Sequence, residues 1–210
     1  MARTSDQSAE AVFVSAIEFN LASTTLGNLT DRLVRLCPNP NGTDDITPGL
    51  MTAASPYAVC RSFAIELFVK SLLKSLDIAF PRVHLLSLLF SKLPESIRDA
   101  IRVAYAYRFS QSILNYEVGA KNNNKSVLEY TEFDYVLSSV ESAFTVWRYV
   151  CDAPVGVHQI HPCLLYVEQA LVDVIIQNRP DWGRHLANVP LVPDFAALGY
   201  PHAQIVEPKD

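Results

Sequence analysis

Apolar side chains recur at helical spacing along most of the chain, and the pattern is densest between Tyr57 and Leu76. In a helix, Ile65, Phe68 and Leu72 would share one broad face, and a second apolar face adjoins it. The polar residues that remain form a narrow stripe with a spacing of four: Ser62, Glu66, Lys70 and Lys74. A helix that is apolar nearly all round is normally enclosed by others. The pattern therefore predicts that this helix is the central element of the fold.

The chain before this helix predicts two helices and a loop. Apolar spacing indicates a helix from about Ala9 to Ser23, and Gly27 is expected to interrupt it. A second, short helix would then follow, capped by Asn28 or Thr30. The run from Pro38 to Pro56 is rich in Pro, Gly, Asn and Asp, which is typical of a long loop.

The chain after the central helix predicts four more helices. The first is RVHLLSLLFSKLP, which ends at Pro94, and the second runs from Glu95 to about Leu114. A third begins at the T-x-x-D sequence of Thr131 and repeats apolar residues at three and four: Phe133, Val136, Val140, Phe144 and Trp147. The last long helix carries Leu164, Val167, Leu171, Val174 and Ile175. Beyond Arg179 and Pro180, an irregular Pro-rich C-terminal arm is expected.

No segment alternates with a period of two, so strands are not expected. The predicted fold class is all-α, a multi-helix bundle. A chain of 210 residues, half of them apolar, suits one domain spanning residues 1–210.

Charge and cysteine content narrow the classes of partner. A net charge of −5 argues against a nucleic-acid coat or an anionic membrane as the partner. The four cysteines form no CxxC pair, and no stretch reaches the length of a membrane span. We therefore expect reduced thiols, no membrane association and a cytoplasmic protein. His158 and His161 lack a third ligand at suitable spacing, so neither a metal nor another cofactor is expected.

Three segments together resemble the HEPN superfamily, helical domains of toxin-antitoxin and defence systems. They are AVCRSFAIELFVKSLLKSL, HLLSLLFSKLP from His84 to Pro94, and FTVWRY ending at Tyr149. The similarity covers about residues 57–178. It implies a bundle of HEPN type that often dimerises and that, in some members, cleaves RNA without a metal.

The cleavage activity of that family depends on an Arg followed by four to six residues and a His. Arg179 and His185 match this spacing, but about one such match is expected by chance in a chain with this many arginines and histidines. Pro180 and Gly183 would also break the helix that should carry both side chains. Arg148 and His158 lie too far apart. We therefore assign no catalytic residue and expect no cleavage of RNA.

The candidate binding residues form a polar cluster: Glu66, Lys70, His84, Arg98, Arg102, Trp147, Arg148 and Tyr149. Each has a structural alternative. Glu66 and Lys70 have the spacing of a stabilising helical pair, and His84 could hydrogen-bond a neighbouring helix. Trp147 fits the core stripe, and Arg148 could pair with Glu141. The arginines could instead bind phosphate, and the aromatic residues could stack on a base.

Two classes of function follow from these residues. The first is a non-catalytic helical interaction module that forms a homodimer or binds a partner protein, within a toxin-antitoxin or defence system. Leu165, Val172 and Ile176 supply a second apolar face on the last long helix, which is typical of an interface. The alternative is a metal-independent RNase or nucleotide-binding HEPN protein. The acidic charge and the missing motif favour the first, so a nucleic-acid partner and an enzyme activity are not expected.

Overall fold

The computed structural model describes residues 8–36, 48–110, 132–139 and 164–187, and 85% of them are helical. These four ranges contain no strand, which confirms the all-α prediction for this part of the chain. The helices are α1 (Ala9–Leu36), α2 (Pro48–Ser75), α3 (Leu86–Ser91), α4 (Glu95–Ser110), α6 (Phe133–Ser139), α8 (Leu164–Asn178) and α9 (Gly183–Ala187), with a 3-10 turn η2 (Pro180–Trp182) before α9.

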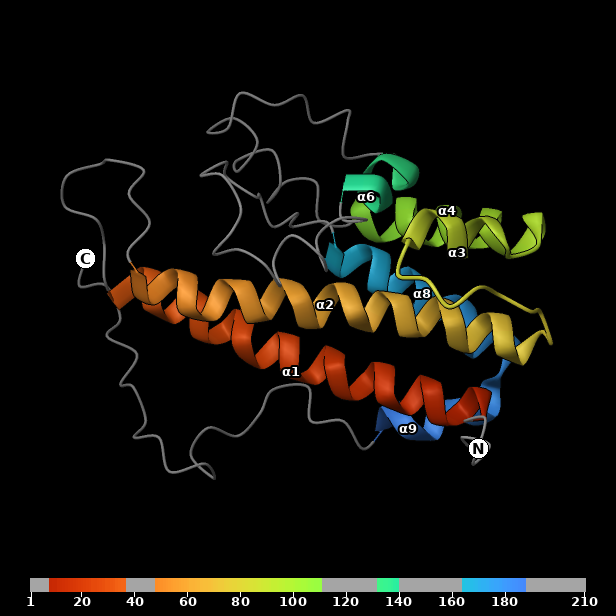
Figure 1. Ribbon diagram of the computed structural model, residues 1–210, viewed down its shortest axis with the longest axis horizontal. Helices are drawn as coiled ribbons and strands as arrows, with labels where there is room; N and C mark the ends of the chain where they lie inside the picture. Colours follow the sequence, from red (N-terminus) through yellow and green to blue (C-terminus); the bar gives the residue numbers. More distant parts are fainter. Residues whose placement is uncertain (1–7, 37–47, 111–131, 140–163, 188–210) are drawn as a thin grey trace.

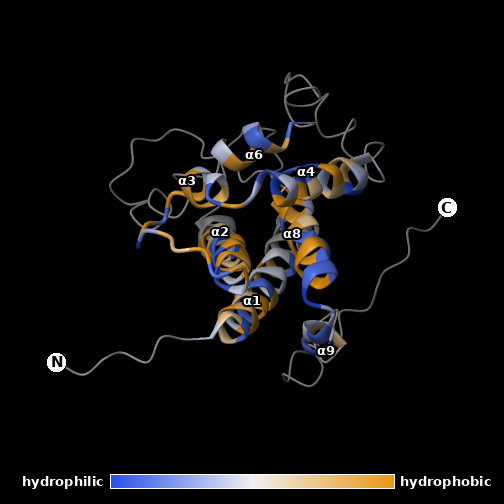
Figure 2. Cartoon of the chain, turned by 90° about the vertical axis from the view of Figure 1, so that its right-hand side faces the viewer, coloured by the Kyte–Doolittle hydropathy of each residue, from blue (hydrophilic) through white to orange (hydrophobic). Residues whose placement is uncertain are grey.

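Helices α1 and α2 form a long antiparallel hairpin along the molecule (Figure 1). Seen from its end, α8 lies beside this hairpin, while α3, α4 and α6 lie across the opposite side from α1 (Figure 2). Helix α2 contacts α1, α3 and α8, as expected of a central element. Helix α4 packs on α8, and α6 contacts α3, α4 and α8.

The core is built from α2 and the helices that cover it. Ile65, Phe68 and Leu72 of α2 are completely buried, as the apolar pattern predicted. Phe13 of α1 packs against Phe68 with ring centroids 5.7 Å apart. Removing each large apolar side chain from water contributes about 1.5–3 kcal/mol, so these contacts hold the hairpin together.

Gly27 does not interrupt α1, and the predicted break and second helix are wrong. The helix continues to Leu36. Gly27 lies where α1 closely approaches the ring of Tyr57 on α2. A Cβ at position 27 would lie 3.0 Å from Cε2 of the Tyr57 ring. The missing side chain makes room for that ring, and tertiary packing outweighs the cost of glycine in a helix, about 1 kcal/mol.

Alanine substitutions at Gly27 and Gly183 are expected to differ. Gly183→Ala should raise the free energy of unfolding by about 0.4–1 kcal/mol, because its Cβ meets nothing within 4 Å. Gly27→Ala should give no such gain, because its Cβ would displace the Tyr57 ring. Urea denaturation followed by circular dichroism measures both. An equal gain at the two positions would show that the Tyr57 ring does not restrict residue 27.

The predicted loop from Pro38 to Pro56 is also partly wrong, because α2 already begins at Pro48. Proline is tolerated at the start of a helix, where its missing N–H needs no partner. Pro56 lies inside the helix, and its ring is exposed. Residues 37–47 lie outside the described residues.

The arm after Arg179 is not irregular throughout, in contrast to the prediction. Pro180–Trp182 form the 3-10 turn and Gly183–Ala187 form α9. Trp182 is completely buried against Phe13, with ring centroids 5.1 Å apart. Burial of the indole outweighs the local effect of Pro180 and Gly183. Residues 188–210 lie outside the described residues.

The remaining predicted helices agree with the structure where it describes them. The helices predicted after Arg82 and Pro94 correspond to α3 and α4, and the one predicted at Leu164 corresponds to α8. Phe133 and Val136 are buried on α6, as their spacing indicated. The rest of that apolar stripe lies outside the described residues: Val140, Phe144 and Trp147. Among the described helices, none combines the length and the apolar character needed to cross a membrane.

Candidate functional site

Three of the predicted site residues meet on α2. The carboxylate of Glu66 accepts a hydrogen bond from Lys70 Nζ at 2.5 Å. His84 Nδ1 lies 3.1 and 3.0 Å from the two oxygens of the same carboxylate. The Glu66 side chain is 2% exposed, whereas Lys70 is 17% and His84 57% exposed. A buried carboxylate thus holds two basic side chains that face progressively toward solvent.

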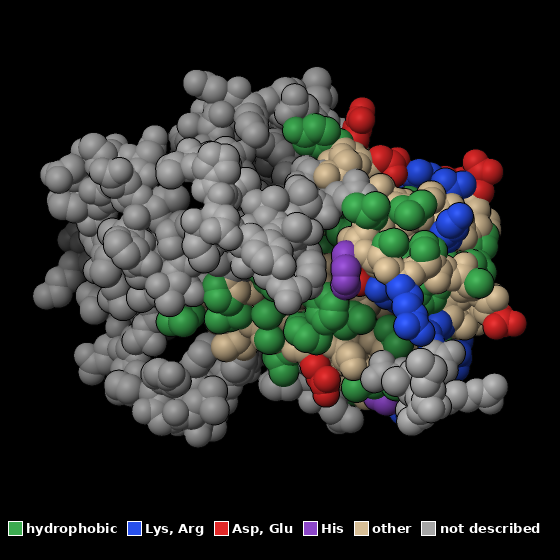
Figure 3. Space-filling model, viewed as in Figure 1, with side chains coloured by type: hydrophobic (Ala, Val, Ile, Leu, Met, Phe, Trp, Pro, Cys, Tyr) green, Lys and Arg blue, Asp and Glu red, His purple; other side chains and the backbone are tan. Residues whose placement is uncertain are grey.

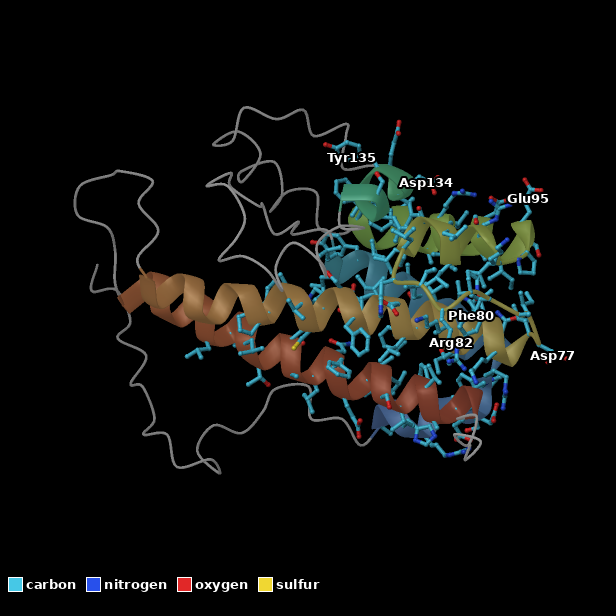
Figure 4. All side chains as sticks on the ribbon, in the orientation of Figure 1. Asp77, Phe80, Arg82, Glu95, Asp134 and Tyr135 are labelled. Atoms are coloured by element: carbon cyan, nitrogen blue, oxygen red, sulfur yellow. The ribbon has the colours of Figure 1, made fainter. Side chains whose placement is uncertain are left out.

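The turn at the end of α2 brings His84 back to Glu66. Ile78 N–H donates to the Leu73 carbonyl at 2.9 Å, and Asp77 N–H donates to Lys74 at 3.1 Å. This is the Schellman pattern of a helix end, and Asp77 has the positive φ of 56° that the pattern requires. Figure 4 shows Asp77 at the tip of this turn, with Phe80 and Arg82 in the segment that follows. The segment therefore reverses direction before it reaches α3.

The Glu66 cluster has one feature of a catalytic site. A carboxylate that accepts a hydrogen bond from one ring nitrogen orients an imidazole for proton transfer. The ammonium group of Lys70, however, is already paired with the same carboxylate. The same geometry can also be purely structural, because the contact between His84 and Glu66 attaches the segment before α3 to the centre of α2. The predicted Glu66–Lys70 pair is present, and Glu66 is buried rather than on the surface.

The two other predicted arginines within the described residues belong to α4. Arg102 donates through Nε and Nη2 to Asp134 of α6 at 3.0 and 3.2 Å, and through Nη1 to Asp99 at 2.9 Å. The hydrogen bond to Asp134 raises the pKa of Arg102 above its usual value. Arg98 is partly exposed, and its Nε is buried without a hydrogen-bond partner. Arg102 therefore joins α4 to α6, and each of its three guanidinium nitrogens donates a hydrogen bond to a carboxylate.

Several predicted residues lie outside the described residues. These are Trp147, Arg148 and Tyr149, together with His158 and His161, and with Glu141, the proposed partner of Arg148. Their roles remain predictions from the sequence.

The Arg179–His185 match does not form a joint site, because each side chain pairs with its own carboxylate. Arg179 donates to Asp181 at 2.9 and 3.2 Å, and its guanidinium lies 4.4 Å from the centroid of the Trp182 ring. His185 Nε2 lies 2.6 Å from Oε1 of Glu10, which also accepts from Arg184. The hydrogen bond to His185 lowers the pKa of Glu10. The spacing is consistent with a chance match.

A buried ion pair that was not predicted from the sequence joins α2 and α8. Arg61 Nη1 donates to Glu168 Oε2 at 2.6 Å, and the side chains are 4% and 1% exposed. Arg61 Nε and Glu168 Oε1 are buried and have no hydrogen-bond partner. Burial raises the pKa of Glu168 to about 7, although Arg61 lowers it through its charge and its hydrogen bond. Loss of hydration thus outweighs the attraction between the two groups.

A signal for this pair was present in the helical spacing. Arg61 precedes Ile65 by four residues, and Glu168 follows Leu164 by four. Both charges therefore occupy positions on apolar faces that were predicted to be buried. Two opposite charges at core positions of two helices predict a buried pair, because a buried charge is costly unless it is paired.

A cavity of about 350 Å³ lies beside this pair, between α1 and α8. Its apolar walls are Leu21, Leu165, Val172 and Leu186, and its polar walls are Asn20, Thr24, Arg108, Glu168, Gln169 and Asp173. Arg108 donates to both oxygens of Asp173, at 2.9 and 2.8 Å. Glu168 is the one buried charge among these lining residues.

The described residues contain no group of three or more His, Cys, Asp or Glu side chains that could hold a metal ion. Comparison of the chain with protein-family models, with curated proteins and with solved structures found no match. The likeness to the HEPN superfamily therefore stays a prediction from the sequence.

Proposed function

We propose that this protein is a non-catalytic helical interaction module that forms a homodimer through α4. The observation that carries the proposal is a pair of apolar side chains on successive turns of that helix. Val103 is 70% exposed and Tyr107 is 62% exposed. The resemblance to the HEPN superfamily suggests the setting, a toxin-antitoxin or defence system.

These side chains are not needed to attach α4 to the bundle. The opposite face of α4 already buries Ile101, Tyr105 and Phe109. Tyr105 packs on Phe109 and on Phe133 of α6. Val103 and Tyr107 thus form a second apolar stripe on the outside of the helix, and exposed stripes of this kind often mark an interface.

The residues around Val103 suit contact with a second copy of the same helix. In an antiparallel pair centred on Val103, Tyr107 of one copy would face Asp99 of the other, because each lies four residues from the centre. A tyrosine hydroxyl can donate a hydrogen bond to a carboxylate. Ala100 and Ala106, each three residues from Val103, are small enough to let the helices approach.

The face originally predicted for the dimer is less suitable. Val172 and Ile176 of α8 are partly buried and pack against the core. Leu165, at 39% exposed, is the large apolar residue of α8 that reaches solvent. We therefore assign the interface to α4 in place of α8.

The pattern of charges supports a non-catalytic role. Cleavage of RNA requires a cation for the phosphate and a group that transfers a proton. Within the described residues, most arginines hold a carboxylate: Arg61–Glu168, Arg102–Asp134, Arg108–Asp173, Arg179–Asp181 and Arg184–Glu10. Basic and acidic side chains are interspersed on the described part of the face in Figure 3. A phosphate would have to displace these internal partners.

Light scattering combined with size-exclusion chromatography tests the proposal. The wild type should have the mass of a dimer at micromolar concentration, and Val103→Glu should have the mass of a monomer with unchanged helix content. Leu165→Glu, which changes the exposed residue of α8, is the matched control and should remain dimeric. A monomeric wild type, or a dimer that only Leu165→Glu separates, would refute the assignment to α4.

A cleavage assay separates this function from the alternative. RNA incubated with the protein without added metal should remain intact, and His185→Ala and His158→Ala should not alter that result. Cleavage by the wild type that is lost in either variant would make the protein a nuclease instead.

A further inference from the structure

The cavity beside the Arg61–Glu168 pair has the size and lining of a small-molecule site. Its volume of about 350 Å³ falls within the range of ligand pockets, about 300–1,000 Å³. Helices α1 and α8 form its long walls, and Arg108 of α4 and Leu186 of α9 complete it. In Figure 2, α8 lies between α4 and α9, and α1 lies beside α8.

Glu168 lines this cavity, and one of its two carboxylate oxygens has no hydrogen-bond partner. Its Oε2 is paired with Arg61, whereas its Oε1 is buried and has no partner. A buried acceptor without a partner is destabilising, and more so when it is charged. A ligand that donates a hydrogen bond to Oε1 would remove that destabilisation.

The other charged group at the cavity is already satisfied. Arg108 and Asp173 form a pair with two hydrogen bonds, so neither offers an obvious unmatched charge. The cavity lining carries two carboxylates, Glu168 and Asp173, and one arginine. Arg61 behind Glu168 supplies a second positive charge, so the charges around the cavity balance. The feature that selects the ligand is therefore the unused acceptor Oε1 of Glu168, and a charged N–H donor hydrogen-bonds a carboxylate more strongly than a neutral donor does. The four apolar residues of the lining favour a ligand with a compact hydrocarbon body.

We propose that this cavity binds a small organic cation, a primary amine on an apolar body, whose ammonium group donates a hydrogen bond to Oε1 of Glu168. The hydrocarbon part lies against Leu21, Leu165, Val172 and Leu186. This site is separate from the α4 surface, so its test does not depend on dimerisation.

Binding of the amine should strengthen as the pH rises through the titration of Glu168. The pKa of Glu168 is about 7, so its ionised fraction rises from about one tenth at pH 6 to about nine tenths at pH 8. The charged groups around it are Arg61 on α2, Arg108 on α4 and Asp173 on α8. An ammonium ion binds to the ionised carboxylate, so the affinity should increase about tenfold over this range.

Ligand-observed NMR titration of the full chain tests the proposal. The probes are 2-phenylethylamine, cyclohexylmethylamine and hexylamine, with 2-phenylethanol and 3-phenylpropanoate as the neutral and anionic counterparts of the first. At pH 8 at least one amine should bind saturably, at least about tenfold more tightly than its uncharged counterpart. Absence of saturable binding by all three amines, or equal binding of the alcohol, would overturn the proposal.

Variants then locate the bound amine. Glu168→Gln keeps the shape of the side chain and should abolish both the preference for the amine and its pH dependence. Glu95→Gln, at the exposed start of α4 (Figure 4), is the matched control and should change neither. Leu165→Trp keeps the buried charge and narrows the cavity from its rim, so it should also abolish binding. Binding that survives in a folded Glu168→Gln or Leu165→Trp protein would place the amine elsewhere and refute the proposed site.

Discussion

Replacing Arg61 with methionine is expected to lower the free energy of unfolding by about 3–5 kcal/mol at pH 8. Methionine fills a similar volume but leaves the carboxylate of Glu168 buried without its cation. The side chain of Glu168 is only 1% exposed, so its carboxylate would lose its charged partner in a largely dehydrated position. Urea denaturation followed by circular dichroism measures the change.

Two controls isolate the effect of the buried charge. The double variant Arg61→Met with Glu168→Leu should recover most of the stability, because no charge then remains buried. Arg184→Met, which breaks the exposed pair with Glu10, should cost less than about 1 kcal/mol. An equal cost for Arg61→Met and Arg184→Met would contradict the prediction.

The pH dependence gives an independent check on the same pair. Burial raises the pKa of Glu168 to about 7, so the folded state retains a proton that the unfolded state has lost. The stability due to this group is therefore fully present below its unfolded pKa and is lost as the pH rises through 7. The cost of Arg61→Met should accordingly be smaller at pH 5.5 than at pH 8. A cost that does not change with pH would show that Glu168 stays ionised.

Replacing Trp182 with alanine should lower the free energy of unfolding by about 3–5 kcal/mol. The indole is completely buried and packs on Phe13, so it attaches the turn η2 and α9 to α1. Alanine would leave a cavity at this junction and remove the ring over which Arg179 lies. Chemical denaturation measures the loss.

Phenylalanine at position 182 is the matched control. Trp182 Nε1 is buried without a hydrogen-bond partner, so Phe sacrifices no hydrogen bond. Trp182→Phe should therefore cost clearly less than Trp182→Ala. If the alanine variant were as stable as the wild type, the segment after α8 would not be part of the core.

The sequence predicted the helical class and the central position of α2 because both depend on apolar spacing within a single helix. It failed at Gly27 and at Trp182, where the outcome depends on a partner distant in the chain. Gly27 is a helix breaker by local preference, yet the ring of Tyr57 makes a small residue favourable there. The arm after Arg179 contains Pro and Gly, yet Phe13 offers its indole a buried surface.

In the candidate site, too, contacts within one helix were predictable and contacts between distant segments were not. The pattern identified Glu66 and Lys70 as a pair because their spacing alone places them on one face of a helix. His84 was also predicted as a site residue, but its contact with Glu66 was not, since that contact depends on the turn at Asp77. Arg61 and Glu168 were not predicted as a pair, although each lies on an apolar face of its own helix. Their 107-residue separation left no local signal of contact.

The Arg61–Glu168 pair also fixes the register in which α8 docks on the hairpin. The apolar side chains of α8 could fill the core in a position shifted by one turn, because hydrocarbon contacts tolerate sliding. Such a shift moves Glu168 by about 5.4 Å along the helix axis, too far for its hydrogen bond of 2.6 Å to Arg61. Both charges would then be buried alone, so misaligned forms of the bundle are penalised even where their apolar contacts are nearly as good.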